Sequence, residues 1–428
     1  MRLIVVLRER FVNRIGIKCC AINELAILVA YARNHLYIKL LRPPFIKGLP
    51  CFMAPVVIDL NSADDKRDIV HRAVQALAEG KLVVFPTETV YGVAASALSE
   101  EAVSRLMEIK GRQPGHALTL AIKSADDALD FVPSLSPVAQ RLARRCWPGP
   151  VTLVLDDDHP DSVVKRLPPA VREAISPEGT VGLRVPAHGV ILSVLRLSVG
   201  PLALTSANRS GQPDTTTAQE AAEALGEDVE LILDDGKSRY AQSSSVVRVT
   251  NDNIELLREG VLDEQTLREL SGFMVLFVCT GNTCRSPMAE MLMKRRMADK
   301  LNCKVEELED RGFVVQSAGI AAMTGGLSSP EAVQVMSDQG LDLSSHQSQP
   351  LTDRLARYAD IIFTMTAGHR DAIVAQWPDV APRTKLICHD GSDVSDPIGG
   401  PPDLYRGCAE QIDSQLERWT DELDLGAD

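Results

Sequence analysis

The chain has 428 residues, of which 45% are hydrophobic and 24% are charged. This length exceeds one ordinary core and predicts two or three domains, and the composition is typical of a folded, water-soluble protein. The formal net charge of −13 argues against a protein that coats nucleic acid with a broadly basic surface, although a local basic pocket stays compatible with it. Nine scattered cysteines favour free thiols in a reducing compartment, so we expect a cytoplasmic protein.

The first 53 residues differ from the rest of the chain. Residues 1–52 carry nine Lys and Arg against two Glu, which leaves a net charge of −20 for the remainder. The longest uncharged run, Leu25–Ala32, is far shorter than the roughly 20 residues that span a bilayer. Charged residues at 8–10 also interrupt the apolar start that a signal peptide needs. We expect a disordered basic extension without a membrane partner; a targeting or membrane-surface arm is the alternative.

Helix and strand signals alternate from residue 54 to residue 270, which predicts an α/β domain. Apolar residues from Ile69 to Leu77 have helical spacing, and Gly80 is placed to end that helix. A second helix is predicted near residues 100–110 and a third near residues 263–270. The predicted strands, in chain order, are residues 82–85, 119–122, 151–155, 182–185, 202–205, 230–233 and 245–249.

A second α/β domain, residues 273–428, is predicted to open on the apolar strand Met274–Cys279. No long Gly-, Ser- or Pro-rich linker precedes this strand, so the two domains should lie close together. The same succession of strand, loop and helix then repeats. Further strands are predicted at residues 314–317, 361–365 and 386–387, and helices at residues 286–297, 329–340 and 367–376.

The string CTGNTCRS, residues 279–286, is the most informative in the chain. It follows an apolar strand and precedes an amphipathic helix, so its backbone N–H groups and the helix dipole should converge on one anion, as in a phosphate cradle. This field favours Cys279 as a thiolate nucleophile, and the planar fork of Arg285 can bind two phosphoryl oxygens. Asp396, before Pro397, is the candidate proton donor to the leaving group. Ser286 is expected to donate to the sulfur of Cys279.

These residues resemble the low-molecular-weight protein tyrosine phosphatases over residues 274–428, through VCTGNTCRSPMAE, the Ser317–Gly319 turn, His346 and DPIGG. The resemblance implies a flavodoxin-like, four-stranded parallel sheet with helices on both faces, a phosphocysteine intermediate, and neither metal nor cofactor. It also implies that Asn282 braces the loop and that Ser317 supports it. The residues expected to support phosphate binding are Thr280, Gly281, Asn282, Thr283, Cys284, Ser286 and Ser317.

The phosphorylated protein substrate stays open at this point. The tyrosine-specific enzymes carry a bulky Ile or Leu where Thr283 stands, and a small polar residue there is typical of the protein-arginine phosphatase branch. Ile398 stands where both branches have an aromatic residue. Phosphotyrosine and phosphoarginine are equal candidates, and a phosphorylated thiol or a sugar-chain kinase is a further one. Arsenate reductases share the loop but need a closely spaced downstream cysteine pair, which Cys303, Cys388 and Cys408 do not supply.

The first domain carries several short polar strings that are ordinary one by one. FPTETVYG, residues 85–92, places hydroxyls after a predicted strand, at the sheet edge where α/β proteins bind ligands. Lys110 and Arg112 bring two cations to the end of a helix, and Thr205–Asn208 adds small donors and acceptors. On these residues alone the domain would be an α/β protein with an anion-binding cleft.

In their order, however, these strings resemble the YrdC-like threonylcarbamoyl-AMP synthases over residues 56–270, together with WPGPVTLVL, VGLRVPAH, SSSVV and LLREG. The resemblance implies a twisted, open α/β sheet that converts L-threonine, bicarbonate and ATP to threonylcarbamoyl-AMP and pyrophosphate. ATP would be a substrate accompanied by Mg²⁺. A partner transferase would then pass the threonylcarbamoyl group to an adenosine of tRNA. Gln113 and Ala117 replace two prolines common in the family, which should change loop stiffness rather than charge.

By the same resemblance, two sets of side chains line the cleft. Clustered cations among them would offset the triphosphate charge and stabilise the departing pyrophosphate. The ATP set is Lys110, Arg112, Thr152, Arg184, Ser206, Asn208 and Arg258, and the threonine set is Thr87, His116 and Ser244.

We therefore expect a bifunctional enzyme. One alternative is a phosphatase whose first domain has become a non-catalytic RNA-binding or regulatory module. A scaffold with two degraded sites is a third interpretation, and the presence of Cys279, Arg285 and Asp396 argues against it.

Overall fold

The computed structural model describes residues 26–32, 35–41, 55–62, 65–111 and 117–423, and the chain separates into the units Met1–Met53 and Ala54–Asp428. In the first unit, β1 (Ala26–Ala32) and β2 (His35–Leu41) form an antiparallel pair. These strands lie in the extension that we expected to be disordered. Their branched aliphatic and aromatic residues favour extended backbone, a signal that the basic composition concealed. The rest of the extension lies outside the described residues.

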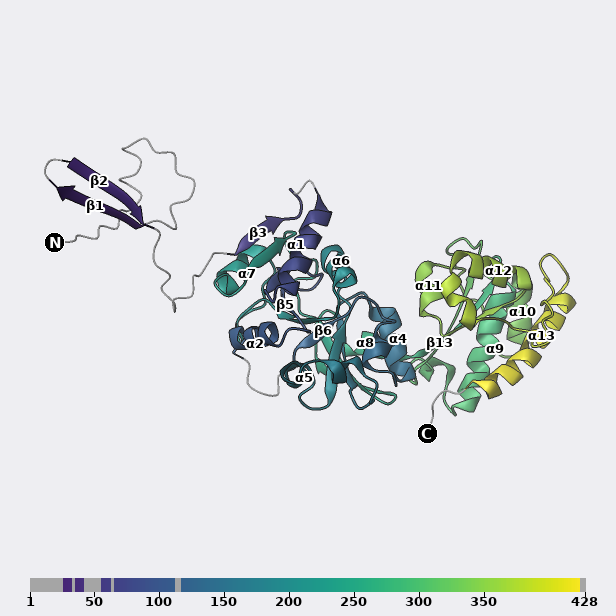
Figure 1. The fold of residues 1–428 in the computed structure, drawn as a ribbon. Helices are drawn as coiled ribbons and strands as arrows, with labels where there is room; N and C mark the ends of the chain where they lie inside the picture. The colour runs from purple at the N-terminus through teal and green to yellow at the C-terminus, as the bar shows by residue number, and fades with distance from the viewer. Residues whose placement is uncertain (1–25, 33–34, 42–54, 63–64, 112–116, 424–428) are drawn as a thin grey trace. The chain divides into compact units, whose positions relative to one another are not determined.

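A mixed sheet of ten strands forms the first domain of the second unit (Figure 1), in the order β12-β11-β7-β8-β6-β9-β5-β4-β10-β3. The sheet contains both parallel and antiparallel pairs and its two edge strands do not pair with each other, so it is an open α/β sheet, as predicted. The strands are β3 (Val56–Asp59), β4 (Val83–Phe85), β5 (Gly92–Ser96), β6 (Thr119–Ala121), β7 (Val151–Asp156), β8 (Thr180–Arg184), β9 (Leu202–Ser206), β10 (Leu231–Asp234), β11 (Ser245–Thr250) and β12 (Asn253–Arg258).

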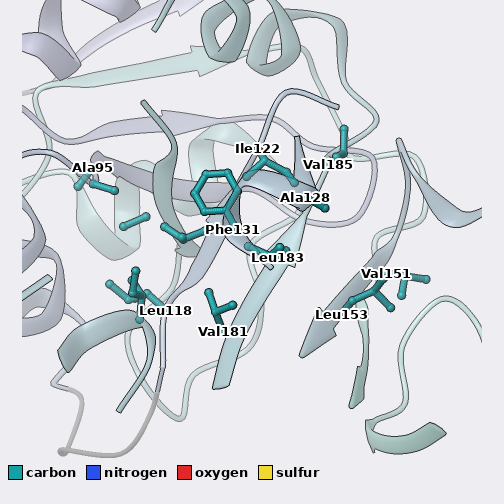
Figure 2. Packing of buried hydrophobic residues seen from close by; sticks show 14 of the residues in the cluster. Ala95, Leu118, Ile122, Ala128, Phe131, Val151, Leu153, Val181, Leu183 and Val185 are labelled. Carbon is teal, nitrogen blue, oxygen red and sulfur yellow. The ribbon is translucent and has the colours of Figure 1, made fainter. Parts of the chain in front are cut away.

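Helices on both faces bury this sheet. Along β4, Val83 and Phe85 belong to one apolar cluster and Val84 to the other, as the period of two in a strand requires. Figure 2 shows the larger cluster, in which Phe131 packs near Ile122 and Leu183. The helices are α1 (Lys66–Ala78), α2 (Glu100–Ile109), α3 (Ala128–Phe131), α4 (Pro137–Cys146), α5 (Pro169–Ile175), α6 (Gly189–Leu197), α7 (Ala218–Leu225) and α8 (Glu264–Ser271).

A four-stranded, all-parallel sheet in the order β14-β13-β15-β16 forms the second domain. This confirms the flavodoxin-like sheet that was expected. Residues of β13 alternate between two apolar clusters, and Cys279 lies on the face that α9 and α13 cover. The elements are β13 (Phe273–Cys279), α9 (Arg285–Lys300), β14 (Phe313–Gly319), α10 (Pro330–Asp338), α11 (Asp353–Tyr358), β15 (Ile361–Thr364), α12 (Ala367–Gln376), β16 (Thr384–Leu386) and α13 (Pro402–Glu422).

Within the unit Ala54–Asp428, one buried arginine joins residues of α4 to residues of the second domain. The Arg145 guanidinium donates to the carbonyl oxygens of Leu270, Gly272 and Tyr358 at 2.6–2.9 Å, and to the Asp360 carboxylate at 2.7 Å. Burial lowers the pKa of Arg145 to about 10, and the Asp360 carboxylate opposes that shift. None of the helices in the described ranges combines the length and apolar character needed to cross a membrane.

Candidate active sites

The loop between β13 and α9 surrounds the sulfur of Cys279. The Asn282 N–H donates to Cys279 Sγ at 3.2 Å, and Ser286 Oγ, in the first turn of α9, lies 3.0 Å from the same sulfur. Cys279 is 3% exposed and Ser286 is fully buried. The amide, the hydroxyl and the N-terminus of a helix therefore all stabilise negative charge at this sulfur.

Asn282 holds the loop in an uncommon conformation. Its φ of 55° lies in the left-handed region, which asparagine tolerates better than most residues. Its Nδ2 donates to Ser286 Oγ at 3.0 Å and to Ser317 Oγ at 2.8 Å, while its Oδ1 accepts from the Gln349 N–H at 2.9 Å. Ser317 Oγ in turn donates to the Glu290 carboxylate at 2.6 Å. These hydrogen bonds of the Asn282 side chain with Ser286, Ser317 and Gln349 thus fix the loop.

Two further contacts hold the same loop. His346 Nε2 lies 3.0 Å from the carbonyl oxygen of Asn282. Gly319, at the end of β14, permits a close approach, because a Cβ there would lie 2.5 Å from the carbonyl oxygen of Thr280 and 2.9 Å from the amide nitrogen of Asn282. Ser317–Gly319, which we predicted as a turn, is the end of strand β14, because these residues continue the parallel pairing with β13. Gly319 therefore explains why this strand end can pack against the phosphate loop.

Arg285 and Asp396 meet although 111 positions separate them in the chain. Arg285 is 5% exposed, and its Nη2 lies 2.5 Å from Asp396 Oδ2, while its Nη1 donates to the carbonyl oxygen of Val394. The Asp396 side chain is 43% exposed, so this carboxylate lies at the mouth of the site. Arg285, the first residue of the helix after the Cys279 loop, and Asp396, the candidate proton donor, are therefore brought together.

The outer part of the loop makes contacts that the sequence analysis missed. Thr280 Oγ1 lies 2.9 Å from His369 Nε2 at the start of α12, and His369 is 5% exposed. Burial is the main cause that lowers the pKa of His369, the Arg285 cation adds to it, and Asp396 and Asp393 act in the opposite direction. The sequence did contain one indication of this contact, because His369 stands four residues after the predicted strand 361–365.

The backbone of Thr283 and the side chain of Cys284 contact the start of α10, and Cys284 also contacts α13. The Thr283 carbonyl oxygen accepts from the Ser329 N–H at 2.9 Å, and the Cys284 thiol donates to Ser329 Oγ at 3.3 Å. Cys284 Sγ also lies 3.8 Å from the Tyr405 hydroxyl. Gly281 completes the loop and is half-buried.

In the first domain, Lys110 caps the C-terminus of α2 and is 4% exposed. Its Nζ donates to the carbonyl oxygen of Ser206 at 2.9 Å and to Asn208 Oδ1 at 2.8 Å, and it also contacts the carbonyl oxygen of Asn208. Ser206 Oγ donates to Asn208 Oδ1 at 2.6 Å. Three members of the expected ATP set, Lys110, Ser206 and Asn208, therefore contact one another. Arg112, also of that set, and the expected threonine ligand His116 lie outside the described residues.

A cavity beside this cluster gathers most of the other selected side chains, and they come from the ends of several strands. Thr152 Oγ1 lies 3.3 Å from Ser244 Oγ, and Arg258 Nη2 donates to that same oxygen at 3.1 Å. Burial lowers the pKa of Arg258, and Arg184 adds to the effect while Asp214 opposes it. The selected residues that line the cavity are Thr87, Thr152, Arg184, Ser206, Ser244 and Arg258.

Arg184 has a partner that the sequence analysis missed. Its Nη2 lies 2.6 Å from Glu88 Oε1 and donates to Thr89 Oγ1 at 2.8 Å, and both Arg184 and Glu88 are buried. The Thr87 hydroxyl donates to the Val90 carbonyl oxygen at 2.6 Å. The PTET turn thus supplies a counter-ion for the arginine as well as hydroxyl groups.

The structure therefore defines an α/β protein with two separate candidate sites, one at the cysteine-containing loop between β13 and α9 and one at a polar cluster at the edge of a mixed sheet. Comparison with known proteins gives the families. Residues 75–260 match the family model described as telomere recombination, which covers the Sua5, YciO and YrdC proteins. Residues 274–426 match the model of the low-molecular-weight phosphotyrosine protein phosphatases.

Individual relatives agree with both matches. The threonylcarbamoyl-AMP synthase of Pyrococcus abyssi is 36% identical over 245 residues, which are 54% of this chain and 69% of that protein. The protein-arginine-phosphatase of Geobacillus stearothermophilus is 32% identical over 155 residues, 35% of this chain and 96% of that protein. The protein-arginine-phosphatase of Bacillus subtilis is 34% identical over 153 residues, 35% of this chain and 95% of that protein. The chain belongs to both families, and the predicted family resemblances and enzyme classes are confirmed.

Proposed function

We propose that this chain makes threonylcarbamoyl-AMP from L-threonine, bicarbonate and ATP in its first domain, and dephosphorylates protein phosphoarginine in its second. The observation that carries the proposal is the assembly of each residue set. In the second domain, Cys279 precedes the loop that leads into α9, and Arg285 at the start of α9 pairs with Asp396; in the first domain, Lys110 contacts Ser206 and Asn208. The product of the first domain would serve N6-threonylcarbamoyladenosine formation on tRNA through a partner transferase.

In the phosphatase reaction, the Cys279 sulfur would attack phosphorus while the bond from phosphorus to the leaving group breaks. Asp396 would give its proton to the leaving atom, and Arg285 with the loop amides would hold the equatorial oxygens. Water would then attack the phosphocysteine, losing its proton to Asp396 as the P–S bond breaks. Ser286 lies 3.0 Å from the sulfur, so it can donate a hydrogen bond to the thiolate as it leaves.

In the synthase reaction, the amine of threonine and bicarbonate would combine, with loss of water, to an N-carboxylated threonine. An oxygen of this carbamate would attack the α-phosphorus of ATP, and the bond from that phosphorus to the β-phosphate would break. Lys110 and Arg258 are the described cations suited to stabilise the charge that develops there. Mg²⁺ would arrive with ATP as part of the substrate, and its ligands would be phosphate oxygens and water.

Phosphoarginine is favoured over phosphotyrosine for a reason at Thr283. This small residue is half-buried, its carbonyl oxygen accepts from the Ser329 N–H, and its hydroxyl oxygen lies 3.6 Å from Cys284 Sγ. That hydroxyl would accept a hydrogen bond from a guanidino N–H of the substrate. Two relatives of this domain are protein-arginine-phosphatases. A β-branched apolar residue there would instead favour a flat aromatic ring.

The test compares the full-length protein on matched peptides that carry phosphoarginine or phosphotyrosine. We expect kcat/KM to be higher for phosphoarginine, and Thr283→Ile to reverse the order, while Cys279→Ser abolishes both activities. Equal loss of both activities in Thr283→Ile would mean that Thr283 does not select the substrate. Higher activity of the unmodified protein on phosphotyrosine would contradict the proposal directly.

The first domain needs its own test, because a non-catalytic RNA-binding or regulatory module is the alternative. We expect AMP-containing product and pyrophosphate to form from ATP only when threonine and bicarbonate are both present, and Lys110→Ala to stop this turnover. Absence of threonine-dependent turnover in a protein with full phosphatase activity would favour the module.

A further inference from the structure

His369 lies between the two loops that carry the phosphatase residues, and no step of the proposed reactions uses it. It stands in the first turn of α12, where its N–H donates to Thr366 Oγ1 at 3.2 Å, and the residue is buried. Its Nε2 lies 2.9 Å from the hydroxyl oxygen of Thr280, the residue directly after Cys279. The first turn of α12 therefore contacts the phosphate loop next to the nucleophile.

The backbone of the same loop residue is held from another side. The Ala321 N–H donates to the Thr280 carbonyl oxygen at 3.0 Å, and the Ile320 N–H donates to that of Cys279 at the same distance. Both donors belong to the segment that follows β14. Thr280 is thus held between the end of β14, through its backbone, and the start of α12, through its hydroxyl group.

The start of α12 also contacts the loop that carries Asp396. The Ala367 N–H donates to Asp393 Oδ1 at 2.7 Å. The Val394 N–H donates to the carbonyl oxygen of Met365, just before the helix, at 2.8 Å. One helix end is therefore hydrogen-bonded to both loops, so a side chain there can fix the position of the nucleophile relative to the acid.

The surroundings of His369 favour the neutral imidazole. Arg285 faces the ring from α9, and Asp393 and Asp396 face it from the loop between β16 and α13. Burial lowers the pKa of His369, the Arg285 cation adds to the effect, and the two carboxylates oppose it. Nδ1 is buried without a hydrogen-bond partner among the described residues. Buried N–H groups without a partner are rarer than acceptors without one, so the proton belongs on Nε2, which donates it to Thr280.

Protonation of His369 would disrupt this arrangement. It would add an N–H at Nδ1, where no described residue accepts a hydrogen bond, and a second positive charge that faces Arg285. A buried charge without full compensation is costly. The imidazolium should therefore leave its buried position and release the Thr280 hydroxyl.

We propose that His369 is a positioning residue of the phosphatase site that acts through Thr280. The neutral imidazole holds the first residue of the phosphate loop in register with the loop of Asp396, and acid releases it. This role, which rests on the proposed phosphatase function, involves no contact between His369 and the substrate. Because Thr280 directly follows Cys279, movement of Thr280 shifts the sulfur relative to Arg285.

The test measures kcat/KM of the full-length protein on a phosphopeptide at pH 7.5 and at pH 5.0. We expect Thr280→Val and His369→Leu each to lower kcat/KM by about tenfold at pH 7.5, the effect of one hydrogen bond. Thr280→Ser keeps the hydroxyl group and should lose less than about threefold. At pH 5.0 the advantage of the unmodified protein over Thr280→Val and His369→Leu should narrow, because protonation removes the same contact. The double variant should be no worse than either single variant.

His389→Leu is the matched control. His389 is a half-buried histidine of the same domain that contacts Gln415 and the ring of Trp419 rather than the phosphate loop. This variant should keep the kcat/KM of the unmodified protein at both pH values. Calorimetry of inorganic phosphate binding gives a second readout, in which we expect Thr280→Val to weaken the affinity by about threefold or more and Thr280→Ser by less.

Three results would overturn the proposal. A loss in His369→Leu that is the same at both pH values would make His369 a purely structural residue. Losses that multiply in the double variant would mean that His369 does not act through Thr280, and an equal loss in Thr280→Ser and Thr280→Val would mean that the hydroxyl group is not the contact. If the unmodified protein hydrolyses no phosphopeptide, the proposed phosphatase function fails, and the phosphate affinities of the two Thr280 variants then decide whether the contact positions the loop.

Discussion

Asn282 combines a backbone role and a side-chain role at the phosphate loop, and substitutions can separate them. Asn282→Ala would remove the hydrogen bonds to Ser286, Ser317 and Gln349 and place an alanine at φ 55°. Misplacing a nucleophile by about 1 Å can cost about 10²-fold in rate. We expect the phosphatase kcat/KM of Asn282→Ala to fall by about that factor, measured on a phosphopeptide.

Asn282→Gly is the control for backbone strain, because glycine adopts positive φ readily. If strain alone mattered, the glycine variant would recover full activity, and the hydrogen-bond network would then be dispensable. We expect it to recover only part. Threonine-dependent ATP turnover should stay unchanged in both variants, since Asn282 lies in the other domain.

His369 is expected to make the stability of the second domain sensitive to acid. Its pKa is lowered in the fold, chiefly by burial and then by Arg285, while in the unfolded chain it should have the ordinary value of about 6.5. Below that value the unfolded state takes up the proton more readily, so the free energy of unfolding falls as the pH drops through 6.5 towards the folded pKa. Above pH 6.5 both states are neutral and this effect is absent.

We therefore expect His369→Gln to reduce the loss of stability between pH 7.5 and 5.5. The measurement is urea unfolding followed by tryptophan fluorescence in a Trp147→Phe background, so that Trp377 and Trp419 report the second domain. If the free energy of unfolding falls equally between pH 7.5 and 5.5 in the proteins with and without His369, the acid sensitivity belongs to other groups. The variant also removes the contact with Thr280, so the comparison concerns the pH slope rather than absolute stability.

At the scale of elements, the end of α4 is joined to β13 and β15 through Asp360. This carboxylate pairs with Arg144 at 2.6 Å and Arg145 at 2.7 Å, and accepts from the Met274 N–H at 2.8 Å. The side chains of Arg145 and Asp360 are 2% and 10% exposed. Removing one partner of a buried ion pair lowers the free energy of unfolding by more than the intact pair contributes. The reason is that the other charge stays buried without compensation.

We expect Asp360→Asn to lower the free energy of unfolding by about 3 kcal/mol, since the carbonyl partners of Arg145 remain. The exposed pair Glu264–Arg268, with both side chains more than half exposed, is the control. There, Glu264→Gln should change stability by less than about 0.5 kcal/mol. Both values come from urea titrations at one pH, and a change as small as the control's for Asp360→Asn would refute a buried, stabilising ion pair.

The helices and strands that we predicted from the sequence are those with a regular spacing of apolar residues, or with residues typical of the beginning or end of an element. The buried strands β4, β7 and β13 and the helices α1 and α9 were predicted to within a few residues. By contrast β5, with the sequence GVAAS, was missed because its small residues carry no strand preference and owe their conformation to pairing with β4 and β9.

The residues of the candidate sites also fall into two groups, those that the sequence predicted and those that it missed. Residues of the phosphate loop were predictable because one contiguous string carries them, and Asp396 followed from its Asp-Pro context. Glu290, Gln349 and His369 were missed, since each reaches the loop only through tertiary contacts. The partnership of Arg184 with Glu88 was missed for the same reason, because 96 positions separate the two residues.

At the scale of the whole molecule, the two residue sets belong to domains with different sheets and separate apolar clusters. Within the described residues, no hydrogen bond or ion pair joins the phosphate loop to the cluster around Lys110. Coupling between two sites requires an element whose equilibrium both sites bias. The contacts of Arg145 are with backbone carbonyls and Asp360, away from both sets of catalytic side chains.

We therefore expect the two activities to be independent. Cys279→Ser should abolish phosphatase activity and leave threonine-dependent ATP turnover within about twofold, because a coupling of 1 kcal/mol would already change affinity about fivefold. Lys110→Ala should do the reverse. The measurement is each activity in each variant, with and without saturating substrate of the other domain. If ATP and threonine change the phosphatase KM in the unmodified protein but not in Lys110→Ala, occupancy of the first site reaches the second, and the contacts of Arg145 with Tyr358 and Asp360 become the route to test.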